Sequence, residues 1–425
     1  MNRYKSSCCL IVFTLLVITM AEAKAEEFRF YFGDGNKEGY QTVNSSTLYD
    51  NDSSYGYDLI ASHADGEPFF FSVKLPEGNY RVKVVLGDQR RDTHTTIRSE
   101  SRRLMLANAE TKAGSMITRS FVVNIRNTSI TADRSVKLKP REIGKLNWDD
   151  KLTLEINGKR PGLREIVIEK AEVPTLFLAG NSTVTDQDNE PWCGWGQMLP
   201  LFLNDRIAVA NYAESGEAAN TFISAGRFAK IVTMMKKGDW LFIEFGHNDQ
   251  KQTGPGKGPY DSYTESLKQL IRGTREKGGT PVLVTPMHRR RFNGNNKIIN
   301  TLGEFPNAMR ELAKQEQVAL IDLNSMSKTL YEAWGPEQSK RAFVHYPAGT
   351  FPGQTEALAD NTHFNAYGGD QLARCIIKGI LENNISLKNH LREDIPPFNP
   401  AHPDDPDCFF LSPTPFTSLT TPEGN

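Results

Sequence analysis

The sequence is poor in cysteine, carries almost no net charge and has no long hydrophobic run beyond its first two dozen residues. Among its 425 residues, only Cys193, Cys375 and Cys408 are cysteines outside the N-terminal segment. An odd number of cysteines leaves at most one intramolecular pair, so no disulfide framework is predicted. No base motif accompanies any of them, so we interpret them as buried or merely exposed thiols rather than catalytic groups.

The near-zero net charge and the lack of metal-binding motifs argue against a nucleic-acid-binding protein and against a metalloprotein. A formal net charge of -1 lacks the basic footprint of a nucleic-acid binder. No His-x-x-x-His or Cys-x-x-Cys pattern occurs, so no metal site is predicted. Charged residues at 24% and hydrophobic residues at 38% are typical of a soluble globular protein. The chain is long enough for two domains with separate cores.

The first 25 residues differ from the rest. Arg3 and Lys5 precede an apolar run from Cys8 to Met20, and the small-residue stretch 21–23 follows it. This pattern predicts a secretory signal peptide over 1–25. Because the apolar run is too short to span a membrane, we expect export to the periplasm or the cell exterior without stable membrane insertion.

Residues 26–172 have the pattern of a β-sandwich domain. Aromatic and β-branched residues fill 28–32, 69–73, 80–86 and 152–156, and turn signals lie at 33–35, 76–79 and 157–158. The region shows no long helical period, as is typical of two packed antiparallel sheets.

Residues 174–390 have the pattern of an α/β domain. Continuous apolar runs at 175–179, 207–210, 240–245, 281–285 and 318–322 predict strands buried on both faces. They alternate with helical spacing over 221–236, 260–277, 303–315 and 366–381. The alternation predicts a parallel sheet covered by helices on both faces. The tail 391–425 is rich in Pro, Ser and Thr, and we expect it either to lie over the surface or to be disordered.

Polar residues follow the predicted strands at the edge where such sheets bind ligands. Ser182 follows the first strand, Gly216 the second and Asn248 the third. Each has a structural alternative, respectively a helix cap, a turn glycine and an Asn-Asp turn. An asparagine N–H can instead donate to a developing oxyanion. Their order along one sheet edge favours a common site.

Asp360 and His363 complete a candidate serine-hydrolase site. A serine is a weak nucleophile that needs a base and a group that orients the base. Asp360-x-x-His363 supplies both, although Asp360 could instead cap the following helix with His363 in its first turn. His247 is the competing base. We favour His363 because it alone has a carboxylate at a fitting spacing and opens a helix after a loop.

These blocks, over about 174–385, resemble the SGNH, or GDSL-type, hydrolase family. The Ser-Thr-Val at 182–184 and the Asp-Asn-Thr-His-Phe at 360–364 are most similar to its rhamnogalacturonan acetylesterases. The resemblance implies a serine esterase that removes acetyl groups from pectic polysaccharide through an acyl-enzyme, with no cofactor and no obligate protein partner. It implies these roles: Ser182 as nucleophile, His363 as base, Asp360 as its orienting group, and Ser182, Gly216 and Asn248 as oxyanion donors. Asn181 departs from the family, which has Asp before the serine, so the charge is lost there.

Three further features could contact the substrate, and each has a structural alternative. Arg289, Arg290 and Arg291 follow the fourth strand and would either grip galacturonate carboxylates or form a solvated basic loop. Trp192 and Trp195 would either stack on sugar rings or pack in the core. The first domain resembles galactose-binding-like β-sandwiches and would either bind sugar or brace the second domain. The alternatives to a pectic acetylesterase are an acetylesterase for another polysaccharide such as xylan and a non-catalytic carbohydrate-binding protein.

Overall fold

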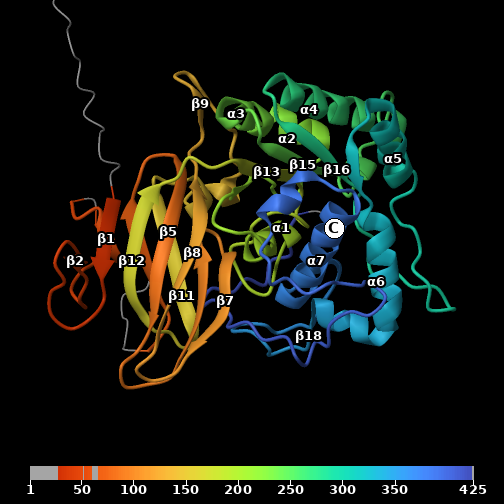
Figure 1. Cartoon of the computed structure of the whole chain (residues 1–425). Coiled ribbons are helices and arrows are strands. Elements are labelled where there is room, and N and C mark those ends of the chain that lie inside the picture. The colour runs from red at the N-terminus through yellow and green to blue at the C-terminus, as the bar shows by residue number, and fades with distance from the viewer. Residues whose placement is uncertain (1–26, 51, 60–65, 424–425) are drawn as a thin grey trace, which may run out of the picture.

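A computed structural model describes residues 27–50, 52–59 and 66–423 of the chain. The predicted signal peptide lies outside the described residues. The remaining chain forms a strand-rich region followed by a region of alternating strands and helices (Figure 1). This order is the one that the sequence pattern predicts.

Two five-stranded sheets make up the first region. One has the order β2-β1-β12-β5-β8 and the other β3-β4-β11-β6-β7, and every pairing except β1 with β2 is antiparallel. The strands of the first sheet are β1 (Glu27–Tyr31), β2 (Gln41–Thr42), β5 (Gly78–Gly87), β8 (Met116–Ile125) and β12 (Leu163–Lys170). Those of the second are β3 (Tyr55–Asp58), β4 (Phe69–Lys74), β6 (Thr93–Ser99), β7 (Arg103–Thr111) and β11 (Lys151–Arg160).

One hydrophobic core joins the two sheets. Phe30 and Val82 of the first sheet and Phe71 and Leu154 of the second are fully buried in the same cluster. Alternate residues of β5 point into this core, as the period of a half-buried strand requires. Between β8 and β11, the chain forms the short antiparallel pair β9 (Ser129–Thr131) and β10 (Arg134–Ser135).

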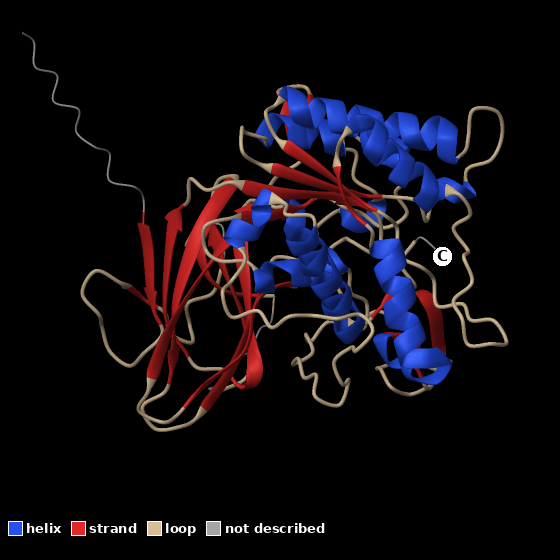
Figure 2. Cartoon of the chain, turned by 45° about the vertical axis from the view of Figure 1, so that its right-hand side comes forward, coloured by secondary structure: helices blue, strands red, loops and turns tan. Residues whose placement is uncertain are grey.

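A parallel sheet of order β14-β13-β15-β16-β17 forms the centre of the second region. Its strands are β13 (Thr175–Gly180), β14 (Ala208–Asn211), β15 (Trp240–Glu244), β16 (Thr280–Val284) and β17 (Ala319–Ile321). Every residue of β13 and β15 is buried, because helices cover both faces (Figure 2). The predicted α/β class is confirmed, and each strand lies within one residue or so of its apolar run.

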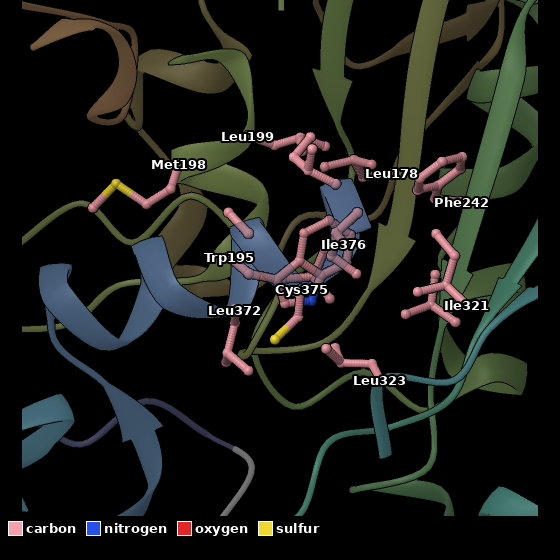
Figure 3. Close-up of a cluster of buried hydrophobic side chains, with 14 of the residues drawn as sticks. Leu178, Trp195, Met198, Leu199, Phe242, Ile321, Leu323, Leu372, Cys375 and Ile376 are labelled. Carbon is pink, nitrogen blue, oxygen red and sulfur yellow. The ribbon is translucent and has the colours of Figure 1, made fainter. Parts of the chain in front are cut away.

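Separate hydrophobic clusters lie on the two faces of this sheet. One contains residues of α1 (Trp195–Met198), α6 (Leu323–Gln338) and α7 (Ala366–Glu382), and Figure 3 shows part of it. The other contains residues of α2 (Ala219–Ser224), α3 (Arg227–Met234), α4 (Thr264–Glu276) and α5 (Phe305–Glu316). Among the described helices, none is long and apolar enough to cross a membrane.

The structure differs from the predicted elements in three places. The helix expected over 221–236 is two helices, because Gly226 adopts a left-handed φ of 81° between them. Helix α6 was not predicted, although its apolar residues up to Trp334 have helical spacing; near its end it is kinked at Gly335, whose φ is 72°. Asp360 and His363 lie in strand β19 (Leu358–Phe364), paired with β18 (Phe343–Tyr346), instead of in a loop and the start of a helix. Asn365 caps α7 in their place by accepting the Gly368 N–H.

The C-terminal tail runs over both regions without forming a helix or strand in its described part, 391–423. The Ser412 carbonyl accepts a hydrogen bond from Arg98 of the first region. The Ser418 carbonyl accepts one from the Trp192 indole of the second, at 2.9 Å. The tail therefore connects the two regions on the side where Trp192 lies.

A buried arginine of the first region, Arg103, pairs with Asp186 in the segment that follows Ser182. The Arg103 guanidinium donates to the Val209 and Asn124 carbonyls at 2.9 and 3.0 Å, and its Nε lies 3.2 Å from Asp186 Oδ2. Both side chains are almost fully buried. Burial raises the pKa of Asp186, against the opposing charge of Arg103. The pair thus places a compensated charge at the contact between the regions.

We expect Arg103→Met to lower the free energy of unfolding by about 3–5 kcal/mol, because Asp186 loses its buried partner. Denaturant unfolding measures the loss. Arg81→Met removes the partly exposed pair with Glu169 and is the matched control, with an expected loss below about 1 kcal/mol. Equal losses in the two variants would contradict the role given to the buried pair.

Candidate active site

Ser182 lies in a tight turn directly after β13. Asn181 Oδ1 accepts a hydrogen bond from the Thr183 N–H at 3.0 Å and lies 2.8 Å from Thr183 Oγ1, and so closes the turn. A side chain at Gly180 would collide with Val184, so the strand can end this close to the turn only with glycine. Ser182 is 1% exposed. The local sequence therefore fixes the serine at the carboxyl edge of the sheet.

His363 and Asp360 form a hydrogen-bonded chain with Ser182. His363 Nε2 lies 2.8 Å from Ser182 Oγ, and its Nδ1 lies 2.8 Å from Asp360 Oδ2. The other carboxylate oxygen of Asp360 accepts the N–H groups of Thr362 and His363, at 2.7 and 3.0 Å. A base held in this way can take a proton from the serine hydroxyl.

The environment keeps Asp360 charged. Burial alone would raise its pKa, but the hydrogen bond and charge of His363 and the two backbone N–H groups lower the pKa overall. Asp360 therefore stabilises the fold at pH values above the pKa it has when unfolded. That contribution is lost as the pH falls through the lower pKa of the folded state.

His247, the competing base, does not contact Ser182. It is buried, and its Nδ1 lies 3.7 Å from Glu244 Oε1. Burial lowers the pKa of its imidazole. The histidine that faces the serine is therefore His363, as predicted. The spacing alone does not distinguish the two histidines, because Glu244 precedes His247 by the same three residues.

Gly216 and Asn248 are brought to the serine by a set of loop contacts. The Gln187 amide donates to the Ser182 carbonyl at 2.8 Å and lies 3.4 Å from Ser215 Oγ. Asn248 Nδ2 donates to the Glu217 carbonyl at 3.0 Å, beside Gly216, whose φ is 79°. The loops after β13, β14 and β15 are therefore joined at one edge. The second hydrogen of the Asn248 amide remains for another acceptor.

Asp249 connects the last two of these loops. Its Oδ1 accepts the Ala219 N–H and its Oδ2 the Gly246 N–H, each at 2.9 Å. Burial raises the pKa of Asp249 to about 7. The Asn-Asp turn is thus present, and the same turn places the Asn248 amide. The structural alternative and the functional interpretation therefore do not exclude each other.

The three candidate arginines occupy different environments. Arg290 is held by its own chain, since it donates to Asn361 Oδ1 at 2.7 Å, to Ser339 Oγ at 2.9 Å and to the Pro336 carbonyl. It therefore braces the strand that carries Asp360. Arg289 is half-buried and lies within the electrostatic reach of Asp360. Arg291 is exposed.

The sugar-stacking interpretation of the tryptophans is wrong, because both rings are covered. Trp195 is fully buried in the core under the sheet (Figure 3), and its indole N–H lies 3.3 Å from Glu244 Oε2. Trp192 is 2% exposed. Its ring stands edge-on to His363, with centroids 5.9 Å apart, and so packs against the imidazole.

Three polar residues near the serine were not identified from the sequence. Glu244 accepts from Thr183 Oγ1 at 2.9 Å, so a buried carboxylate lies beside the turn although Asn181 carries no charge. It is the one charged residue of an otherwise apolar strand, which could have drawn attention to it. Lys139 and Arg141 donate to the Ser215 carbonyl at 2.5 and 2.6 Å. They come from the first region, and no sequence signal connects them to the site.

Within the described residues, no group of three or more His, Cys, Asp or Glu side chains is placed to hold a metal ion. Of the three cysteines discussed above, Cys193 and Cys375 are buried, Cys408 is exposed, and all are free thiols. The polar groups around Ser182 are thus hydroxyl, imidazole, carboxylate and amide groups, which suit acyl transfer.

Comparisons with known proteins agree with this geometry. A model of the GDSL-like lipase/acylhydrolase family matches residues 178–370, a span that contains the serine, glycine, asparagine, aspartate and histidine described above. The rhamnogalacturonan acetylesterase RhgT of Bacillus subtilis is 43% identical over 218 residues, which are 51% of this chain and 93% of RhgT. The probable rhamnogalacturonan acetylesterase YesY of the same organism is 36% identical over 215 residues, which are 50% of this chain and 94% of YesY.

One relative matches both regions. The uncharacterized esterase YxiM of Bacillus subtilis is 25% identical over 416 residues, which are 91% of this chain and 100% of YxiM. A crystal structure of YxiM covers 85% of this chain and 99% of its own, with a TM-score of 0.47 and 25% identity. From the family match and the extensive similarity to RhgT, we conclude that the chain belongs to the GDSL-like lipase/acylhydrolase family and is a carboxylic ester hydrolase.

Proposed function

We propose that this protein is a serine acetylesterase that removes acetyl groups from a pectic polysaccharide, rhamnogalacturonan. The observation that carries the proposal is the chain of 2.8 Å contacts from Ser182 Oγ to His363 Nε2 and from His363 Nδ1 to Asp360 Oδ2. It supplies nucleophile, base and orienting carboxylate in one line.

In the proposed reaction, Ser182 Oγ attacks the carbonyl carbon of the acetyl group while His363 Nε2 takes its proton. The oxyanion receives hydrogen bonds from the N–H groups of Ser182 and Gly216 and from the free amide hydrogen of Asn248. His363 then gives the proton to the departing sugar oxygen, and the acetyl group stays on Ser182. A water molecule, deprotonated by His363, releases acetate and restores the serine.

The pectic substrate is supported by the names of RhgT and YesY, which are 43% and 36% identical to this chain over about half of its length. Arg289 is half-buried, and its guanidinium lies 3.4 Å from both Thr301 Oγ1 and the His247 carbonyl, so it would receive a uronate carboxylate on that side of the site only in place of these long contacts. Export through the predicted signal peptide would bring the enzyme to a polymer that lies outside the cytoplasm. The first region is proposed to be a β-sandwich domain over 26–172 that braces the hydrolase domain over 174–390.

Acetate release from acetylated rhamnogalacturonan and from acetylated xylan, measured side by side, tests the substrate. We expect release from the pectic polymer at a kcat/KM at least about tenfold above that on xylan, as one lost charged contact would produce. Release from xylan alone would keep the reaction and overturn the pectic substrate. Binding of either polymer without release of acetate would favour a non-catalytic carbohydrate-binding protein.

A further inference from the structure

Two cations of the first region lie beside the proposed oxyanion glycine. Lys139 Nζ and Arg141 Nη2 both donate to the carbonyl of Ser215, the residue before Gly216. The segment that carries them contains the short 3-10 helix Pro140–Glu142 and comes between β10 and β11. Their side chains are 24% and 34% exposed, so both retain a face toward solvent. The first region therefore contributes positive charge directly to the edge of the hydrolase site.

Buried carboxylates fix the inner faces of these cations. Arg141 donates to Glu214 Oε1 at 3.0 Å, and Lys139 Nζ lies 3.2 Å from Glu217 Oε1. Both carboxylates have only 4% of their side chains exposed. The positions of the two cations are thus set from within the protein, which leaves their outer faces for another anion.

A carboxylate from the chain's own tail occupies that outer position. Glu423 Oε1 lies 2.6 Å from Arg141 Nη1, and its Oε2 lies 3.5 Å from Lys139 Nζ. A Cβ added at Gly216 would collide with the Glu423 carboxylate and lie 3.0 Å from Lys139 Nζ, so both groups lie directly over the glycine. The hydrogen bond from Arg141 is the main cause of a lowered pKa at Glu423, which keeps it charged.

We propose that Lys139 and Arg141 form a subsite for a uronate carboxylate of the substrate, and that Glu423 fills this subsite when no substrate is bound. The inference rests on the proposed function and names a part of the polymer that the site recognises. An acetylated sugar at Ser182 must place its acetyl oxygen near Gly216. A uronate joined to that sugar then lies within reach of the cations, and a guanidinium with a nearby ammonium suits its carboxylate.

Displacement of Glu423 demands little of the fold. Its side chain is 62% exposed, and exposed ion pairs contribute little to stability. The tail is anchored shortly before it, where the Ser418 N–H donates to the Glu190 carbonyl at 2.8 Å. Residues 419–423 can therefore move aside while the rest of the described tail stays in place. Glu423 thus competes with the substrate from within the chain. The apparent Kd for the substrate equals the intrinsic Kd divided by the fraction of molecules in which the subsite is empty.

Calorimetric titration of the full chain with a de-acetylated rhamnogalacturonan oligosaccharide tests the subsite apart from catalysis. We expect Glu423→Gln to lower the Kd about five- to tenfold, since the competing charge is removed while every cation remains. We expect Lys139→Gln to raise the Kd by about five- to tenfold. The methyl ester of the same oligosaccharide should bind wild type and Glu423→Gln equally, because it offers no carboxylate.

Asp407→Asn is the matched control. Asp407 is also a tail carboxylate paired with an arginine, Arg341, at 2.5 Å, and it is not among the contacts of Lys139 or Arg141. Its Kd should equal that of wild type. An unchanged Kd in both Glu423→Gln and Lys139→Gln, or the absence of binding by wild type and Glu423→Gln alike, would overturn the subsite. Acetate release by wild type reports separately on the proposed function, so a failure of one is distinguishable from a failure of the other.

Discussion

Ser182→Ala should lower kcat for ester hydrolysis by about a millionfold, to the level that binding and the oxyanion donors sustain alone. The reason is chemical, because no acyl-enzyme can form once the hydroxyl is absent. The alanine removes one oxygen from a turn that Asn181 and Thr183 hold through their own hydrogen bonds, so the fold should persist. Steady-state hydrolysis of a small acetyl ester measures the loss, and circular dichroism checks the fold.

The double variant Ser182→Ala/His363→Ala tests whether the two residues act together in one catalytic step. Because His363 contributes through the proton of Ser182, its loss should cost almost nothing once the serine is absent. Additive losses in the double variant would mean that the 2.8 Å contact between the two residues is not the catalytic one. Activity retained by Ser182→Ala would place the nucleophile elsewhere.

Asp360→Asn should lower kcat by about ten-thousandfold with little change in KM, through the tautomer of His363. Asp360 Oδ1 accepts two backbone N–H groups, so an asparagine must keep its oxygen on that side. Its NH2 group then faces His363 Nδ1, which must accept instead of donate. The proton moves to Nε2, and that nitrogen can no longer take a proton from Ser182. Steady-state hydrolysis of a small acetyl ester measures kcat and KM separately for the variant and the wild type.

Asp322→Asn is the control for this charge removal. Asp322 also follows a strand of the parallel sheet and pairs with an arginine, Arg310, at 2.8 Å, but it caps α6 and does not contact His363. We expect its kcat to remain within about twofold of wild type, because the partners of this half-buried carboxylate, Arg310 and the start of α6, take no part in the proposed reaction. A similar loss in both variants would attribute the effect of Asp360 to the general electrostatics of the sheet edge.

Much of the fold could be predicted because most strands and helices of the second region are marked by the spacing of apolar residues in their own sequence. Continuous apolar runs such as Thr175–Gly180 are buried on both faces, and polar turns follow them. The failures have physical causes. Gly226 ends one helix and separates it from the next through its left-handed backbone conformation. The strand that contains Asp360 was missed because it is defined by its pairing with β18, which forms only when the chain folds.

The site was predictable where one short segment carries two functional groups, as in Asp360 and His363. It was not predictable where groups distant in the sequence converge. Lys139 and Glu423 are separated by most of the chain and meet over Gly216 only in the folded protein. The tryptophans show another limit. The sequence near the proposed nucleophile does not tell whether an aromatic ring faces the substrate or the core, and only the structure shows that both rings are buried.

The central claim is that Ser182 is the nucleophile and that His363 activates it. Labelling with a serine-directed fluorophosphonate, followed by peptide mapping in a mass spectrometer, tests this claim most directly. The account predicts modification of wild type at Ser182 alone, and almost none in His363→Ala within the same time. Labelling of another residue, or equal labelling of Ser182 in both proteins, would contradict it.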